Sequence, residues 1–311
     1  MSEPDLTADQ LKALRRAAAG GEYHLLLGAG ASLDSVSTKG QRLPSGGELA
    51  GKLAVEFDVP IEEGDLLWRI YARVVDKAGE ERVYDWLRRL FHGVHPPDWM
   101  EKFASFPWEC VWTLNLDDSF EQAFRKVKTE VSRNERSVNW DDQYRTGRGL
   151  DIVHLHGKVD QEEPQKLIFS LTEYATAAVS RAAWPVTFRD QYGVKPIVII
   201  GARLRDEPDI EAIVARRSPV QEAPSLYISP GITDVMAQDL MSWNLIPIRM
   251  TAERFADTWA ELTGFDLSLP PAPRDELAMR VARQFKELRT DRPRRVPQSH
   301  DFHRWGRADM G

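Results

Sequence analysis

Four short segments of the chain each follow a hydrophobic run, and their residue types suit the binding of a phosphorylated ligand. In chain order they are residues 28–32, 113–117, 154–157 and 200–204. Glycines permit tight turns and the close approach of a phosphate to the backbone. Amide, carboxylate and imidazole side chains can orient or deprotonate a nucleophile. Each segment is common by itself, so the prediction rests on their number and order.

The first segment directly follows the apolar run 23–27. Gly28 and Gly30 permit a tight turn there and let the backbone approach a pyrophosphate, whose charge free amides can hold. The third glycine of the Gly-x-Gly-x-x-Gly dinucleotide fingerprint is absent, because Leu33 occupies its place. The sequence therefore does not predict an ordinary dehydrogenase. A glycine turn without a ligand is the alternative that this segment alone leaves open.

Polar side chains also follow the apolar run 109–114. Asn115 and Asp117 come just after it, where open parallel sheets place their ligands. The same residues could instead begin a helix whose first amides need a capping side chain. We expect that capping role to fall to Asp118 or Ser119.

Two histidines mark the end of the run 150–155. His154 and His156 are two residues apart on a predicted strand, so their rings could share one face. No third metal ligand is evident, and we therefore predict no metal site. A neutral imidazole can accept a proton near neutral pH. The alternative is a structural histidine held by backbone carbonyls.

The hydrophobic pattern predicts the elements that position these segments. Short apolar runs bounded by turn residues are typical of strands covered on both faces. Strands that alternate with helical spacing predict an α/β fold with a doubly wound, largely parallel, Rossmann-like sheet. The predicted strands are 23–27, 109–114, 150–155, 166–169, 196–200, 225–228 and 245–248.

The remaining segments suggest how the chain is divided. Helical spacing predicts a small helical insertion at 60–108, and the polar loop 33–43 is a candidate lid. Residues 1–265 would form the catalytic domain, followed by a linker, a helix and a basic tail at 266–311. The tail combines an apolar stripe with several arginines on an acidic chain. We therefore expect it to dock on a second copy or a partner protein.

Composition narrows the classes of function. The formal net charge of −7 argues against a surface that coats nucleic acid. No apolar run approaches the roughly 20 residues that span a bilayer, and charges occupy the place of a signal peptide's apolar stretch. We therefore expect a cytoplasmic protein. Cys110 is the only cysteine, so neither an intrachain disulfide nor a cysteine-based zinc site can form.

Taken together and in this order, the four segments resemble the sirtuin-like family over roughly residues 20–265. The resemblance lies in Gly-Ala-Gly-x-Ser at 28–32, Thr-x-Asn-x-Asp at 113–117, His-x-His-Gly at 154–157 and the later glycine turn, where Arg203 departs from the usual serine. Protein deacetylases of the family carry four zinc-binding cysteines, which this chain lacks. The sequence therefore resembles the bacterial sirtuin-like domains that hydrolyse NAD in antiphage defence better than it resembles the deacetylases.

The resemblance implies a role for each candidate residue. Asn115 would position the attacking water or the ribose, Asp117 would contact the nicotinamide side, and His156 would be the catalytic histidine. His154 would be structural. The residues that bind NAD would be Gly28, Ala29, Gly30, Ser32, Gly201, Ala202, Asp206 and Ser229.

The implied activity is that of an NAD glycohydrolase, which forms nicotinamide and ADP-ribose without a metal. Nicotinamide departs as a neutral molecule and needs no general acid, so an amide, a carboxylate and an imidazole suffice. Two alternatives are a non-catalytic module that senses NAD or ADP-ribose, and an NAD-dependent deacylase or ADP-ribosyltransferase. Destruction of a cofactor must be restrained, so we expect an oligomer or a partner such as a motor ATPase or a nucleic-acid sensor.

Overall fold

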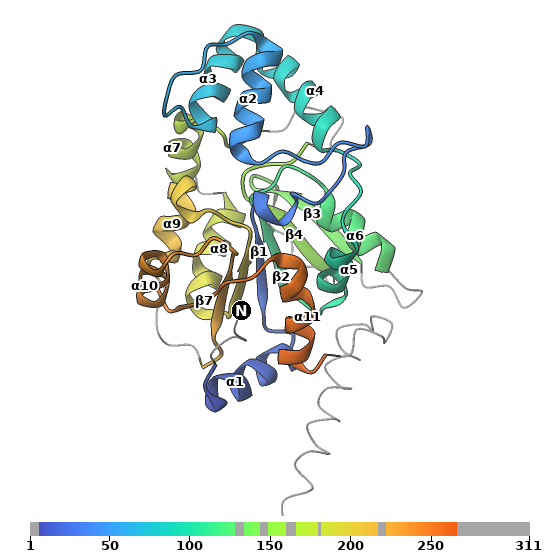
Figure 1. Cartoon of the computed structure of the whole chain (residues 1–311), viewed down its shortest axis with the longest axis vertical. Helices are drawn as coiled ribbons and strands as arrows, with labels where there is room; N and C mark the ends of the chain where they lie inside the picture. The colour runs from blue at the N-terminus through green and yellow to red at the C-terminus, as the bar shows by residue number, and fades with distance from the viewer. Residues whose placement is uncertain are drawn as a thin grey trace, which may run out of the picture.

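The centre of the molecule is a seven-stranded parallel sheet, seen in a computed structural model that describes residues 6–127, 134–143, 149–159, 166–179, 182–216 and 222–265. The strand order is β3-β4-β2-β1-β5-β6-β7, and each neighbouring pair is parallel. Figure 1 shows helices on both sides of this sheet. The predicted doubly wound, Rossmann-like fold is therefore confirmed. The strands are β1 (His24–Leu27), β2 (Cys110–Thr113), β3 (Glu135–Asn139), β4 (Leu150–His154), β5 (Ile197–Ile200), β6 (Ser225–Ile228) and β7 (Leu245–Ile248).

The central strand shows why its sequence is apolar throughout. β1 lies between β2 and β5, and all four of its residues are buried. Leu25 and Leu27 contact the hydrophobic core on one face of the sheet, whereas Leu26 contacts the core on the other. A strand covered on both faces needs apolar residues at successive positions.

The helices form two layers and one separate group. The helices α1 (Ala8–Ala19), α5 (Asp98–Ser105), α6 (Ser119–Val127) and α11 (Ala252–Thr263) contribute to one core. The opposite core includes α8 (Ala183–Val194), α9 (Pro208–Val214) and α10 (Asp234–Ser242). The third group, α2 (Gly46–Phe57), α3 (Leu67–Ala78) and α4 (Glu80–Phe91), lies beyond one end of the strands in Figure 1, and α7 (Leu171–Val179) is near it.

Residues 60–108, predicted as a helical insertion, contain three helices that pack in different places. The helices α3 and α4 share a core with α2 around Leu53, Ile70 and Leu87. Helix α5 instead places Trp99 in the core that it shares with α1, α6 and α11. The division of the chain into domains stays a prediction.

Two segments differ from the predicted strands. Residues 166–169 form no strand. The Ile168 amide donates to the His156 carbonyl at 2.9 Å, beyond the end of β4. The strand β3 is absent from the prediction because its sequence, Glu-Arg-Ser-Val-Asn, is mostly polar. It pairs only with β4 and forms an edge of the sheet, where polar residues are tolerated.

The ends of the chain add little to this description. Among the described residues, no helix is both long and apolar enough to cross a bilayer. The predicted linker, helix and basic tail at 266–311 lie outside the described residues. Their docking on a second copy or a partner stays a prediction.

Candidate active site

A cavity of about 490 Å³ lies between the carboxyl ends of the central strands and the helices α2 and α3. The strand that follows β1 in the chain, β2, lies on one side of β1 in the sheet, and β5 lies on its other side. This edge of the sheet is therefore a topological switch point, where open parallel sheets bind their ligands. The predicted site residues that line the cavity are Gly28, Ala29, Gly30, Ser32, Asn115, Asp117, His156, Gly201, Ala202 and Asp206.

One predicted cofactor residue lies outside the lining of this cavity. Ser229 follows β6 and is half-buried. Its hydroxyl accepts the amide of Gly231 at 3.3 Å, which stabilises the turn after the strand. A contact between Ser229 and a cofactor stays a prediction.

The glycine-rich loop after β1 packs tightly against the loop after β5. An added Cβ would lie 2.4 Å from Ala202 Cα at Gly28, and 2.8 Å from Gly201 Cα at Gly30. The amides of both glycines donate to carbonyls of β5 and its loop, each at 2.9 Å. The expectation that these amides are free for a phosphate is therefore wrong. Within the described residues, only the Ala29 amide among residues 28–32 lacks a backbone acceptor.

A buried hydrogen-bonded group connects the first two segments. Asn115 Nδ2 donates to the Gly28 carbonyl at 3.1 Å and to Ser32 Oγ at 2.9 Å. Ser32 Oγ in turn donates to Asp117 Oδ1 at 3.0 Å. Asn115 Oδ1 is buried and has no hydrogen-bond partner among the described residues. Since buried polar atoms are almost always bonded, Oδ1 is an acceptor available to a ligand or water.

Asp117 also supports the local fold. Its Oδ1 accepts the Ser119 amide at 3.0 Å, at the first residue of α6. Burial raises the pKa of the Asp117 carboxyl, although the hydrogen bonds from Ser119 and Ser32 act against the rise. The Asp118 carboxylate instead accepts two backbone amides before α5, at 3.0 and 3.1 Å. The start of α6 is therefore capped by Asp117 and not, as expected, by Asp118 or Ser119.

His154 is buried between two acceptors. Its Nδ1 lies 2.9 Å from the Asn115 carbonyl oxygen, and its Nε2 lies 2.8 Å from Glu121 Oε1 on α6. Burial disfavours the charged ring, but the charge and hydrogen bond of Glu121 prevail and raise the pKa of His154. An imidazolium can donate to both acceptors at once. His154 therefore holds the backbone of Asn115 in place.

His156 is buried beside two carboxylates. Its Nε2 lies 3.2 Å from Asp209 Oδ2, and its Nδ1 lies 3.4 Å from Glu207 Oε2. Despite burial, the charge of Glu207 and the hydrogen bond with Asp209 raise the pKa of His156. His156 therefore stays protonated to higher pH than an ordinary histidine, whereas the sequence predicted a neutral imidazole. The Tyr174 ring stands edge-on to His156, with centroids 5.3 Å apart, and its hydroxyl donates to Glu207 at 2.8 Å.

His156, Glu207 and Asp209 lie close enough together for a metal site, but the two carboxylates do not face the same ring nitrogen. Ligand atoms of His156, Glu207 and Asp209 lie within 4.8 Å of one another. The two carboxylates, however, face different ring nitrogens, whose lone pairs point apart in the plane of the ring. The arrangement is therefore that of a histidine hydrogen-bonded between two carboxylates, and the absence of a metal stays a prediction.

The residues that contact the two histidines are missing from the predicted site. Glu207 and Asp209 follow the segment 200–204, and this short separation is the one sequence signal that could have indicated them. Glu121 and Tyr174 belong to helices whose packing the local sequence does not specify. Their roles become evident only from the tertiary structure.

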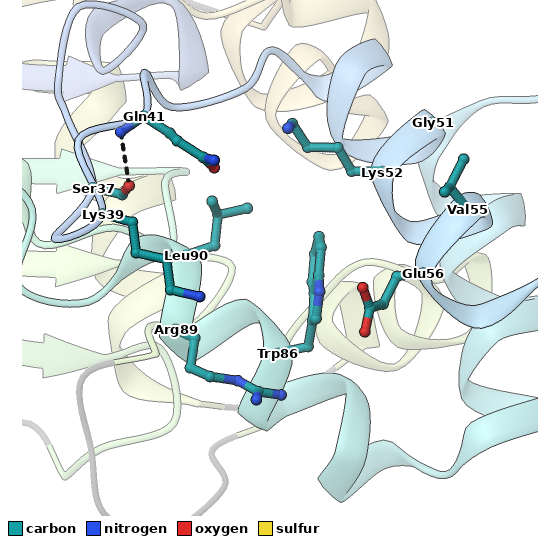
Figure 2. A pocket seen from close by; sticks show the side chains of 10 residues that line it. All are labelled: Ser37, Lys39, Gln41, Gly51, Lys52, Val55, Glu56, Trp86, Arg89 and Leu90. Atoms are coloured by element: carbon teal, nitrogen blue, oxygen red, sulfur yellow. Dashed lines mark hydrogen bonds between the residues drawn. The ribbon is translucent and has the colours of Figure 1, made fainter.

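A second hollow lies on another side of α2. It measures about 520 Å³ and lies between the loop 37–41 and the helices α2 and α4 (Figure 2). Lys39, Lys52 and Arg89 contribute cations around Trp86, but the charged side chains that line it are all exposed. No histidine lines it. We therefore place the candidate active site in the cavity at the strand ends.

Comparison with known proteins gives one family match. Residues 109–229 match the model of the SIR2-like domain. The match supports a sirtuin-like domain. It contains Asn115, Asp117, His156 and the loop after β5, whereas the glycine-rich loop after β1 precedes it. No protein with a curated description matches the chain significantly.

Several solved structures are similar at low identity. A mutant Sir2 homologue in complex with ADP-ribose has a TM-score of 0.44 and 15% identity, and the alignment covers 90% of this chain and 98% of that one. A Sir2 homologue in complex with NAD has a TM-score of 0.42 and 13% identity, with 91% and 97% covered. A third structure, described under the mechanism and regulation of Sir2 enzymes, has a TM-score of 0.44 and 11% identity, with 83% and 98% covered.

Proposed function

We propose that this protein is an NAD glycohydrolase, which cleaves NAD into nicotinamide and ADP-ribose. One observation carries the proposal: the unpartnered amide oxygen of Asn115 and the imidazole of His156 belong to the same cavity at the switch point of the sheet. The SIR2-like match over 109–229 supports a dinucleotide as the ligand. The cavity volume also lies within the usual range for small-molecule sites, about 300–1,000 Å³.

The residues present suit the chemistry of this reaction. The bond between nicotinamide and ribose breaks with its electron pair going to the pyridine nitrogen, so no proton is needed on the leaving group. The enzyme must align a water molecule and stabilise an oxocarbenium-like ribose. Asn115 Oδ1 would accept a hydrogen bond from the water or a ribose hydroxyl, and His156 would take the proton as the water oxygen bonds to the ribose carbon.

The other side of the cavity would exclude bulk water. Leu67, Trp68 and Ile70 of α3 line it, as does Phe91 at the end of α4. Exclusion of water strengthens electrostatic interactions within a site. Asp117 would then act with greater effect on the positive charge that develops on the ribose.

We further propose that the activity is regulated and serves in bacterial antiphage defence by depleting NAD. The proposal rests on the resemblance of the four segments to defence-associated sirtuin-like domains. Loss of NAD during phage infection, in cells that express the intact chain but not an inactive variant, would support it. Unchanged NAD in infected cells that express the active protein would contradict it.

The first prediction concerns the products of the reaction. Purified full-length protein incubated with NAD, alone and with a candidate partner, should form nicotinamide and ADP-ribose in equal amounts. Chromatographic quantification of both products over time checks this expectation. Addition of an acylated lysine peptide should not raise nicotinamide release, because a deacylase would require that substrate. Binding of NAD by calorimetry without turnover would favour the sensing alternative, and no binding at millimolar NAD would contradict both.

A further inference from the structure

The two ring nitrogens of His156 have different surroundings. Nδ1 lies toward Glu207, which lines the cavity together with Tyr174. Nε2 lies toward Asp209, which does not line the cavity. The ring therefore has one side on the candidate ligand site and the other on the protein behind it.

We propose that Asp209 is the positioning residue of His156: it accepts a hydrogen bond from Nε2–H and thereby directs Nδ1 toward the cavity as the atom that receives the substrate's proton. This inference rests on the proposed function. A carboxylate behind an imidazole fixes both the orientation and the tautomer of the ring.

The structure keeps Asp209 charged and fixed in place. Although burial disfavours its charged form, the hydrogen bond and charge of His156 lower the pKa of Asp209. Its helix, α9, is anchored by Ile210 and Val214 in the core of the sheet. Asp209 Oδ2 contacts His156 Nε2, and the backbone amides of Asp209 and Ile210 further favour the charged carboxylate by lowering its pKa.

Glu207 occupies the place where a substrate hydroxyl would meet Nδ1. Burial raises the pKa of the Glu207 carboxyl, so it can hold a proton shared with His156 in the free protein. A ribose hydroxyl or water would replace Glu207 at Nδ1 and pass its proton there. The resulting imidazolium would be stabilised by Asp209, while Glu207 stays hydrogen-bonded to Tyr174. These three side chains are the titratable groups that face the ring among the described residues.

The test compares Asp209→Asn with Glu211→Gln in the full chain. Glu211 is on the same helix and half-buried, and it has no side-chain hydrogen bond or ion pair among the described contacts. Asp209→Asn should lower kcat by about 100-fold with little change in KM. The acid limb of its kcat/KM profile should move to lower pH, because loss of the carboxylate lowers the pKa of His156. Glu211→Gln should leave both measurements unchanged, and Asp209→Glu should restore part of the rate.

A second measurement does not depend on turnover. In the ligand-free wild-type protein, nitrogen NMR of labelled histidines should show His156 in the tautomer with hydrogen on Nε2 once the ring is neutral. The signal is assigned by its loss in His156→Gln. Hydrogen on Nδ1 instead, or a pKa of His156 that is the same in Asp209→Asn and wild type, would overturn the inference. A protein that never hydrolyses NAD yet shows the expected tautomer and pKa change would refute the proposed function while retaining the role of Asp209.

Discussion

Asn115→Ala is expected to lower the kcat of NAD hydrolysis by about 100-fold or more. Losses of this size follow when a group that orients the nucleophile or contacts the transition state is removed. The substitution removes the buried amide oxygen that no described residue satisfies, together with the donors to Ser32 and the Gly28 carbonyl. Initial rates of nicotinamide release check this expectation. Circular dichroism and the unfolding midpoint should show that the variant remains folded.

Two further variants test whether the loss is specific to this amide. Asn115→Asp keeps the shape but adds a carboxylate near Asp117, so it should also lose activity. Gln191→Ala removes an amide from α8, outside the lining of the cavity, and should hydrolyse NAD at the wild-type rate. Near-normal turnover by Asn115→Ala would remove this residue from the mechanism.

The proposed catalytic histidine should be equally sensitive. His156→Ala is expected to lose about 100-fold or more in kcat, because no other described imidazole lines the cavity. Calorimetric titration with ADP-ribose should show that the variant still binds the product. A rate similar to wild type would assign the proton transfer to another group.

The fold was predictable where burial requires a pattern in the sequence. Strands such as β1 and β5 are covered on both faces, so their apolar runs identify them. The polar edge strand β3 carries no such pattern, since its position depends on pairing with β4. The run 166–169 is apolar because Leu167 and Ile168 pack in cores beyond the sheet, which sequence alone cannot distinguish from a strand.

The site was predictable for residues that directly follow strands. The carboxyl ends of parallel strands meet at one edge, so Asn115 and His156 had to approach one another once the sheet was recognised. The carboxylates that contact His154 and His156 depend on how α6 and the start of α9 pack; they are Glu121, Glu207 and Asp209. They are also 3 of 48 acidic residues in the chain, so residue type alone could not single them out.

The glycines show a different limit. Gly28 and Gly30 were assigned to the binding of a phosphate, and the same residue type is required by the contact with Gly201 and Ala202. Both explanations need a position without a Cβ. The sequence therefore identifies the residues but not the reason for them.

The buried pair of Glu121 and His154 should be the ion pair on which stability depends most. Glu121 Oε1 lies 2.8 Å from His154 Nε2 and accepts Ser137 Oγ at 2.6 Å, and both members of the pair are almost fully buried. Loss of one partner leaves an uncompensated buried charge, which costs about 3–5 kcal/mol. Glu121→Gln should therefore lower the free energy of unfolding, measured with urea, by this amount. Glu101→Gln, which removes an exposed pair with Lys126, should cost about 0–1 kcal/mol.

The pH dependence gives this prediction a sign. The charge and hydrogen bond of His154 overcome burial and lower the pKa of Glu121 from 4.5 to about 2, so its stabilisation is complete above pH 4.5 and is lost as pH falls through about 2. The pKa of His154 is raised from 6.5, so its stabilisation is complete below pH 6.5 and is lost as pH rises through the raised value. The difference between wild type and Glu121→Gln should therefore be largest between pH 4.5 and 6.5. A difference independent of pH would show that the pair is not ionised in the folded protein.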